Sequence, residues 1–124
     1  MGGKASRDKG KRGEREAAKY LSDLLGSELR RAQQFAGGVD SADIVGLEGV
    51  HFEVKRVERL RIYEAVAQAV ADSGDNCPVV MHRTNNKPWL LTVRVDDLPR
   101  LSEIIAAQCS TMSKGTGNCG GGTP

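Results

Sequence analysis

Three residues in this sequence have side chains and a spacing that could form a catalytic metal site. Asp43 stands at the start of a short apolar run, and Glu53 and Lys55 follow in the segment VHFEVK of residues 50–55. Side chains alternate between the two faces of a strand, so Glu53 and Lys55 share one face, and a hairpin would bring Asp43 beside them. Two carboxylates and an ammonium would then lie together.

Such a cluster indicates a particular chemistry. Neighbouring carboxylates repel each other, so one of them takes up a proton unless a cation binds. Hard oxygen ligands on a partly open site suit Mg²⁺ or Mn²⁺, and these ions polarise a phosphoryl oxygen and lower the pKa of bound water. Lys55 could stabilise the charge that develops on the phosphate or orient the attacking water. The pattern therefore predicts metal-dependent hydrolysis of phosphodiester bonds, with Mg²⁺ as the cofactor and Mn²⁺ as a substitute.

Glu14 supplies a third carboxylate. It continues the helical stripe of Ala18, Leu21 and Leu25, which places it on the inward face of an expected helix. The alternative is a first-turn residue that favours the positive end of the helix dipole and reaches solvent. The sequence leaves both interpretations open.

Helical and strand periods alternate along the chain, which predicts an α/β domain. The expected elements are a helix over 13–25, strands over 28–35, 44–47 and 50–55, a helix over 60–73, strands over 78–82 and 89–95, and a last helix capped by Asp96 or Asp97. The predicted fold has three layers, with helices on both faces of a mixed central sheet. The Asp43 and Glu53 strands lie side by side in it.

Two further expectations concern the core. In the helix over 60–73, the apolar residues at helical spacing are expected to face the sheet: Ile62, Val66, Ala69 and Val70. Trp89 and Tyr63 are also expected inside, because the chain has only five aromatic residues.

Length and charge predict one domain with two polar ends. The 124 residues suffice for a single core, and no apolar run approaches the roughly 18 to 20 residues that span a bilayer, so we expect no membrane segment. Residues 1–12 carry five Lys or Arg against one Asp, or +4, whereas the whole chain carries +2. We expect a flexible basic arm (1–12), a folded domain (13–108) and a disordered Gly/Ser/Thr tail (109–124).

The basic segment KGKRGERE of residues 9–16, with Gly37-Gly38, Asp43-Ile44-Val45 and Glu53-Val54-Lys55, resembles the PD-(D/E)xK nuclease superfamily. Within it the sequence is most similar to the archaeal-type Holliday junction resolvases and their viral relatives. The resemblance implies a restriction-endonuclease-like fold and a homodimeric endonuclease that acts on branched DNA. The basic N-terminus leads into a charged helix instead of an apolar signal core, so we expect a cytoplasmic protein, in the host cytoplasm if viral. The three cysteines fit neither disulfides nor a zinc site, which agrees with a reducing compartment.

The resemblance also implies roles for individual residues. The family's metal and catalytic positions match Glu14, Asp43, Glu53 and Lys55, and its DNA-backbone contacts match Lys9, Lys11, Arg12 and Arg15. Many nucleases of this superfamily carry a glutamine near the scissile phosphate, which Gln68 matches, although plain solvated surface is the alternative for it.

A basic run and a histidine lie close to the predicted site. Arg56 and Arg59 belong to a basic run just past the predicted site, and we expect them to contact phosphates, with a solvated helix entry as the alternative. His51 shares the face of Glu53 and Lys55, but a lone strand histidine is more often structural. We therefore leave it out of the predicted site.

Other functions stay open. The same site could serve a repair or restriction-like nuclease on other DNA substrates. A nucleic-acid-binding accessory protein would use the basic arm beside a vestigial acidic cluster, and a structural component would have no nucleic-acid role. An isolated D-x9-E-x-K pattern also arises by chance. The agreement of helix Glu, glycine loop, Asp strand, Glu-x-Lys strand and basic arm favours a nuclease.

Overall fold

The structure is a computed structural model that describes residues 2–32 and 42–109, with side chains described from residue 10. The elements are α1 (Gly2–Leu25), β1 (Arg30–Arg31), β2 (Ile44–Val45), β3 (Val50–Arg56), α2 (Ile62–Ser73), β4 (Cys77–Arg83), β5 (Leu90–Thr92), the 3₁₀ turn η1 (Val95–Asp97) and α3 (Leu98–Gln108). Each element expected between residues 13 and 108 has a counterpart. Within the described segments, none of the helices combines the length and apolar character needed to cross a bilayer.

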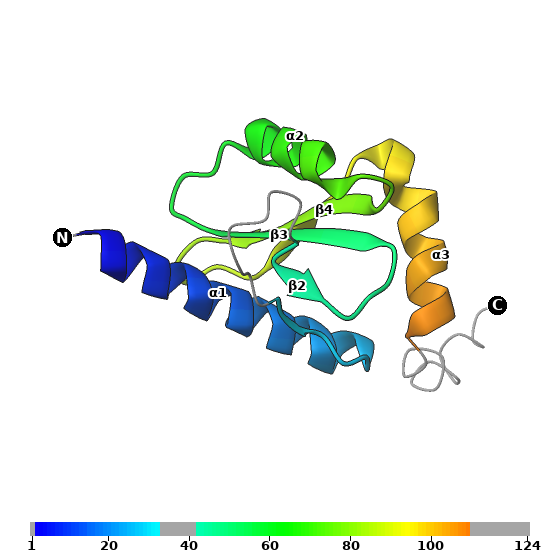
Figure 1. The fold of residues 1–124 in the computed structure, drawn as a ribbon, viewed down its shortest axis with the longest axis horizontal. Helices are drawn as coiled ribbons and strands as arrows, with labels where there is room; N and C mark the ends of the chain where they lie inside the picture. The colour runs from blue at the N-terminus through cyan, green and yellow to red at the C-terminus, as the bar shows by residue number, and fades with distance from the viewer. Residues whose placement is uncertain (1, 33–41, 110–124) are drawn as a thin grey trace.

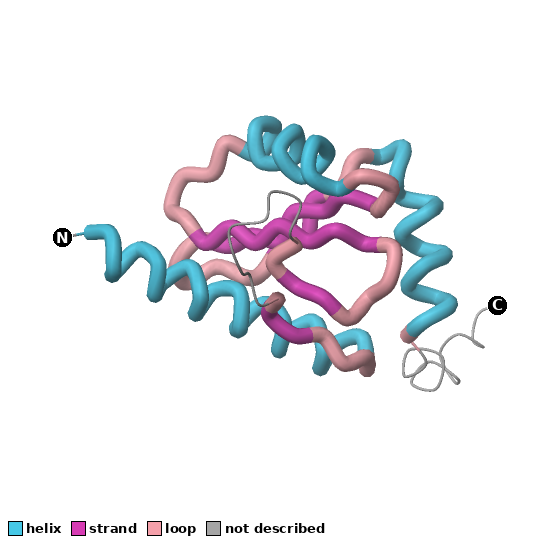
Figure 2. Tube along the Cα trace, in the orientation of Figure 1, coloured by secondary structure: helices cyan, strands magenta, loops and turns pink. Residues whose placement is uncertain are grey.

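The strands form one mixed sheet in the order β1-β2-β3-β4-β5. Strands β3 and β4 are parallel, and the other neighbouring pairs are antiparallel. Figures 1 and 2 show α2 on one side of the sheet and α1 on the other, with α3 at the end away from the start of α1. The predicted α/β architecture, with a mixed sheet between helices, is confirmed.

Alternation along the central strands divides the core between the two faces of the sheet. The larger cluster joins β3 and β4 to α1 and α3 through residues that include Ala17, Leu21, Phe52, Met81 and Leu101. The smaller cluster joins Val80 of β4 to Ala65 and Ala69 of α2. On β3 the same alternation turns His51 and Glu53 away from the larger cluster, toward α2.

Helix α1 begins earlier than the sequence predicted, because residues 2–12 form its first turns instead of an irregular arm. Ala17 and Ala18 anchor the helix by burial. Once a helix is nucleated, each added residue contributes a further hydrogen bond. Lysine and arginine are good helix formers, and a single glycine such as Gly10 costs only about 1 kcal/mol. The helix ends as expected, with Gly26 at a φ of 67°.

The buried face of α2 differs from the predicted stripe. Its fully buried residues are the small ones, Ala65, Ala69 and Ser73, while Ile62 and Val66 are only partly buried. Small side chains let the helix backbone approach Val80 closely, so the larger residues lie at the flanks of the contact. Ala69 is buried as predicted, and the rest of the buried face is rotated by about one residue from the predicted stripe.

The expectation for the aromatic residues is half right. Trp89 is partly buried against the larger cluster, and the Arg83 guanidinium lies 5.7 Å from the centre of its ring. Tyr63 is 89% exposed, so its predicted place in the core is wrong. It lies in the first turn of α2, apart from the small residues through which this helix contacts Val80.

The turn between β2 and β3 depends on Gly46, which has a φ of +123°. A Cβ atom there would lie 2.4 Å from the backbone oxygen of Glu28. We expect Gly46→Ala to lower the free energy of unfolding by about 3 kcal/mol, from backbone strain and overpacking together. Urea denaturation measures this. The comparison is Gly10→Ala, whose Cβ meets nothing within 4 Å and which should raise stability by up to about 1 kcal/mol, because it replaces a helical glycine. Equal stability of Gly46→Ala and wild type would contradict the close approach.

Candidate active site

Asp43 is held at the start of β2 by contacts on both sides. Its backbone N–H donates to the carbonyl of Phe52 (2.8 Å), and its own carbonyl accepts from the N–H of Ala32 (2.9 Å). Its carboxylate Oδ2 accepts a hydrogen bond from the N–H of Val54 at 2.8 Å. Because Val54 lies between Glu53 and Lys55, Asp43 is beside the Glu-x-Lys strand, as the hairpin prediction required.

The pKa of Asp43 shows which charges surround it. Burial raises this pKa from 3.8 to about 6, against the lowering effect of the hydrogen bond from Val54. The charges of Glu53 and Glu14 raise it as well, and Lys55 lowers it. All four predicted residues therefore lie within electrostatic reach of one position, at the open end of the β2–β3 hairpin.

The raised pKa of Asp43 predicts a pH-dependent stability in metal-free protein. The folded state binds the Asp43 proton more tightly than the unfolded state, so this contribution to stability is complete below pH 3.8 and is lost as the pH rises through about 6. Asp43→Asn removes the charge and keeps an oxygen for Val54. We expect the variant to gain on the order of 2 kcal/mol relative to wild type between acid and neutral pH.

Urea denaturation in EDTA at pH 5 and pH 7.5 measures that gain. Asp75→Asn, at an exposed position after α2, is the control and should show no such change. A stability difference for Asp43→Asn that is the same at both pH values would contradict the electrostatic description of this carboxylate.

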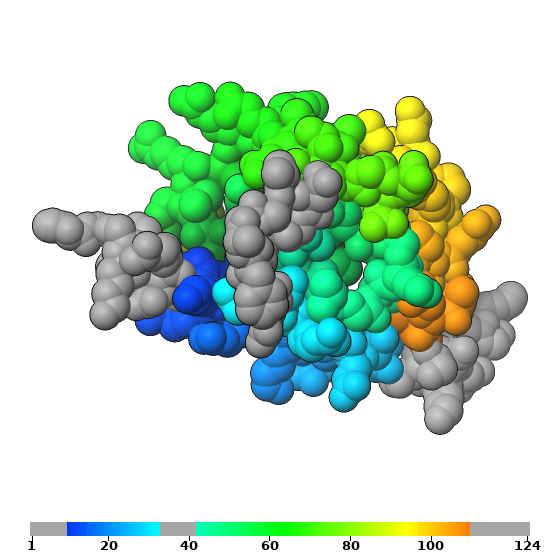
Figure 3. All heavy atoms as spheres, in the orientation of Figure 1, coloured from blue at the N-terminus to red at the C-terminus, as the bar shows by residue number. Residues whose placement is uncertain are grey.

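Glu14 and Lys55 line one pocket of about 450 Å³ at this end of the sheet. Figure 3 shows α1, in blue, beside the green segment that follows β3. The Glu14 side chain is 20% exposed, and its Oε1 accepts a hydrogen bond from Arg31 Nε at 2.8 Å. The inward-facing interpretation of Glu14 is therefore confirmed. Arg31 is a partner that the sequence pattern did not indicate.

Glu53 belongs to a second group, which contains residues outside the predicted site. Its Oε2 lies 2.9 Å from His51 Nε2, and both side chains are almost fully buried. Asp72 of α2 completes a set whose ligand atoms all lie within 4.8 Å of one another. An imidazole nitrogen and carboxylate oxygens are common metal ligands, so this buried group could hold a metal ion.

The three predicted carboxylate ligands do not form an equally tight set among the described residues. Glu14 is paired with Arg31, and Glu53 with His51. Three carboxylates repel one another when no cation lies between them, which favours separate partners for each. Glu53 is the one residue that the predicted site and the second group share.

The predicted nucleic-acid contacts have different surroundings. Lys11, Arg12 and Arg15 are exposed on α1, and Arg59 is exposed between β3 and α2. The side chain of Lys9 lies outside the described residues, and so does the Gly37-Gly38 loop. The exposed cations lie on the elements that wall the pocket of Glu14 and Lys55.

Arg56 has an internal role that the basic run did not indicate. Its Nε lies 3.4 Å from Oε1 of Glu16, and Arg83 pairs with the other oxygen of that carboxylate. Gly13 allows α1 to come this close, since a Cβ there would lie 3.3 Å from Arg56 Cβ. The guanidinium of Arg56 thus ties β3 to α1.

Lys55 has two polar neighbours. Its Nζ lies 3.5 Å from Gln68 Oε1, a weak contact that places the predicted auxiliary residue near the site. His82 is the partner of Lys55 in the β3–β4 register, and its Nε2 lies 2.8 Å from Thr92 Oγ1. Burial lowers the pKa of His82. No pattern in the sequence indicated His82 beside Lys55, because this neighbour depends on the register of two strands far apart in the chain.

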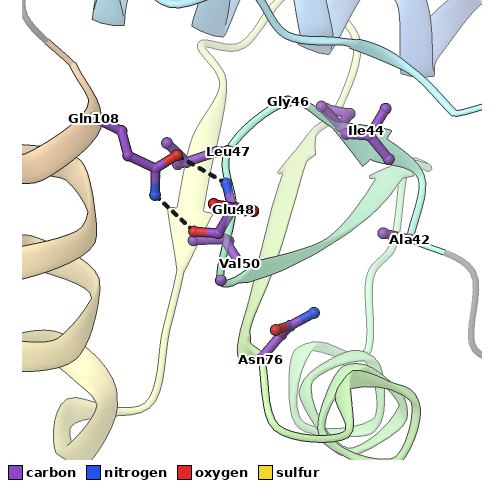
Figure 4. A pocket seen from close by; sticks show the side chains of 10 residues that line it. Ala42, Ile44, Gly46, Leu47, Glu48, Val50, Asn76 and Gln108 are labelled. Atoms are coloured by element: carbon purple, nitrogen blue, oxygen red, sulfur yellow. Dashed lines mark hydrogen bonds between the residues drawn. The ribbon is translucent and has the colours of Figure 1, made fainter.

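Another pocket, of about 550 Å³, lies at the β2–β3 turn. Figure 4 shows Gln108 of α3 reaching the backbone of Glu48, which donates to the Gln108 amide oxygen (3.0 Å) and accepts from its nitrogen (2.7 Å). Glu48 is the one ionisable residue in its lining. This pocket has no group of side chains suited to catalysis, and its contacts fasten α3 to the hairpin.

Comparison of the chain with protein-family models, with curated proteins and with solved structures finds no match. A functional proposal for this chain therefore rests on the geometry of the site.

Proposed function

We propose that this protein is a Mg²⁺-dependent, structure-selective DNA endonuclease with a restriction-endonuclease-like fold, and that it resolves Holliday junctions. The observation that carries the proposal is the 2.8 Å hydrogen bond from the Val54 N–H to Asp43 Oδ2, which sets this carboxylate beside the Glu53-Val54-Lys55 strand. Glu14 and Lys55 line one pocket at the same end of the sheet. The resemblance to PD-(D/E)xK nucleases predicts that these four residues form the metal site. The exposed cations of α1 extend from the same end.

The donor set fits a hard divalent cation. Asp43 and Glu53 would hold Mg²⁺, with Glu14 holding it or its water, and Mn²⁺ would substitute. When bound, the ion polarises a phosphoryl oxygen and lowers the pKa of its water. The raised pKa of Asp43 supports this fit, because a bound cation offsets the repulsion between neighbouring carboxylates and stabilises their ionised form.

The protein's own groups supply the rest of the reaction. Hydrolysis requires in-line attack of water on phosphorus, with departure of the opposite oxygen. Lys55 carries a positive charge beside that phosphate and stabilises the negative charge that develops there. Lys11, Arg12 and Arg15 bind the phosphates of the DNA arms and make the affinity salt-dependent.

A homodimer is part of the proposal, because symmetric cleavage of a four-way junction needs two active sites. An apolar depression between α1, β5 and α3 supports it. The exposed apolar residues Tyr20, Leu24, Leu90 and Leu91 line this surface. A second copy would remove it from water.

The experiment is a cleavage panel with the full chain. Labelled four-way junction, flap, linear duplex and single strand are incubated in Mg²⁺ and in EDTA, and light scattering gives the oligomeric state. Paired, Mg²⁺-dependent nicks on the junction are the expected result. Equal cutting of linear duplex would contradict the assignment as a resolvase and still support a nuclease. Binding without cutting in any metal would favour an accessory protein.

A further inference from the structure

The polar group beneath α2 is unusual for its burial. His51 is 2% exposed and Glu53 is 5% exposed. They stand two residues apart on β3, so their side chains share the face that α2 covers. Neither the predicted chemistry nor the resemblance to the nuclease superfamily gives His51 a role.

A buried carboxylate requires a partner, because burial of an unpaired charge is costly. The 2.9 Å between His51 Nε2 and Glu53 Oε2 is the ordinary length of an N–H···O hydrogen bond. The imidazole therefore fixes the orientation of the Glu53 carboxylate. The other oxygen of Glu53, Oε1, makes no hydrogen bond or ion pair with a described residue.

We infer that His51 is a positioning residue, whose hydrogen bond to Oε2 of Glu53 orients this carboxylate so that Oε1 is presented to the metal ion. The inference rests on the proposed function, in which Glu53 is a metal ligand. Hydrogen bonds to a ligand carboxylate from the next layer of residues are a general way of fixing its direction and basicity.

Direct binding of the metal by His51, Glu53 and Asp72 is the competing description. The His51 and Glu53 side chains are only 3% and 7% exposed, so an ion between them would lose almost all its water. Mg²⁺ gives up water reluctantly, and imidazole nitrogen is a ligand of softer ions such as Zn²⁺. For a Mg²⁺ enzyme, the observations favour His51 acting through Glu53.

Two variants of His51 provide the test, since both carry a carboxamide and they differ in side-chain length. The glutamine nitrogen in His51→Gln can occupy the place of Nε2, whereas the shorter side chain in His51→Asn cannot. Mn²⁺ affinity is measured by electron paramagnetic resonance, with urea denaturation of each protein as the check on folding. His82→Asn, in the neighbouring strand, is the control for loss of an imidazole.

We expect wild type, His51→Gln and His82→Asn to bind Mn²⁺ with similar affinity, and His51→Asn to bind about 10- to 100-fold more weakly. Junction cleavage by His51→Asn should recover in part at high Mg²⁺. In a Glu53→Ala background, the change from His51 to Asn should have no further effect, because the histidine acts through that carboxylate.

Three results would overturn the inference. Equal Mn²⁺ affinity of His51→Asn and wild type, with junction cleavage intact in both, would contradict the positioning role of His51 and leave the proposed function supported. A nitrogen coupling to Mn²⁺ in the wild-type pulsed spectrum that His51→Gln abolishes would make the imidazole a direct ligand. A wild-type protein that binds no Mn²⁺ and cuts no DNA would remove the proposed function and this inference together.

Discussion

Glu53→Ala should lower the single-turnover rate of junction cleavage in Mg²⁺ by about 1,000-fold or more. The substitution removes the carboxylate that would hold the metal, and metal stabilisation of a phosphoryl transition state amounts to several kcal/mol, with about 1.4 kcal/mol for each factor of ten. Glu53 is also the one residue shared by the predicted site and the buried group with His51 and Asp72. No other single carboxylate should have a larger effect.

The control for this variant is Glu103→Ala, which removes an exposed carboxylate from α3. Its rate should equal that of wild type. Gel shifts in Ca²⁺ would show whether Glu53→Ala still binds the junction, and urea denaturation would show that it is folded. A Glu53→Ala rate within tenfold of wild type would mean that the cleaving metal is held elsewhere.

Lys55→Met should lower the cleavage rate by about 100- to 1,000-fold while junction binding stays close to that of wild type. Methionine keeps most of the length of the side chain and removes the ammonium that would face the transition-state charge, and loss of one preorganised donor has an effect of this size. Single-turnover kinetics at saturating enzyme separate the rate from binding.

Lys19→Met is the matched control, because Lys19 is an exposed lysine of α1 that pairs with Asp23. It should leave the rate unchanged. If Lys55→Met weakened binding and slowed cleavage only in proportion to bound DNA, Lys55 would be an ordinary phosphate contact, and its catalytic role would be wrong.

The parts of the site that depend on short-range patterns could be predicted from the sequence. Alternation in VHFEVK placed Glu53 and Lys55 on one face of β3, and a short turn made the hairpin that brings Asp43 beside Val54. The stripe through Ala18 and Leu21 gave the inward direction of Glu14 as one of two interpretations, and the contact with Arg31 decides between them. In each case a local period of two or 3.6 residues determines the side-chain direction.

The remaining parts depend on contacts between distant segments. Asp72 meets His51 only because α2 packs across β3, and Arg31 meets Glu14 only because β1 lies against α1. The internal pairing of Arg56 with Glu16 also requires the close approach of α1 at Gly13. No period in the sequence encodes these distances.

Helix boundaries and burial also depend partly on local sequence signals and partly on contacts between distant segments. The end of α1 follows from Gly26, a local signal, but its early start reflects propagation from a packed segment. The exposure of Tyr63 reflects the small residues through which α2 contacts the sheet. Propensity and composition alone do not determine which face of a helix finds a partner.

The most direct test of the account is the position of the metal in a crystal grown or soaked with Mn²⁺, located by its anomalous scattering. We expect a peak within coordination distance of the carboxylates of Asp43 and Glu53, with His51 in contact only with Glu53. A peak bound by His51, Glu53 and Asp72 without Asp43, or no peak on Glu53 at all, would contradict it.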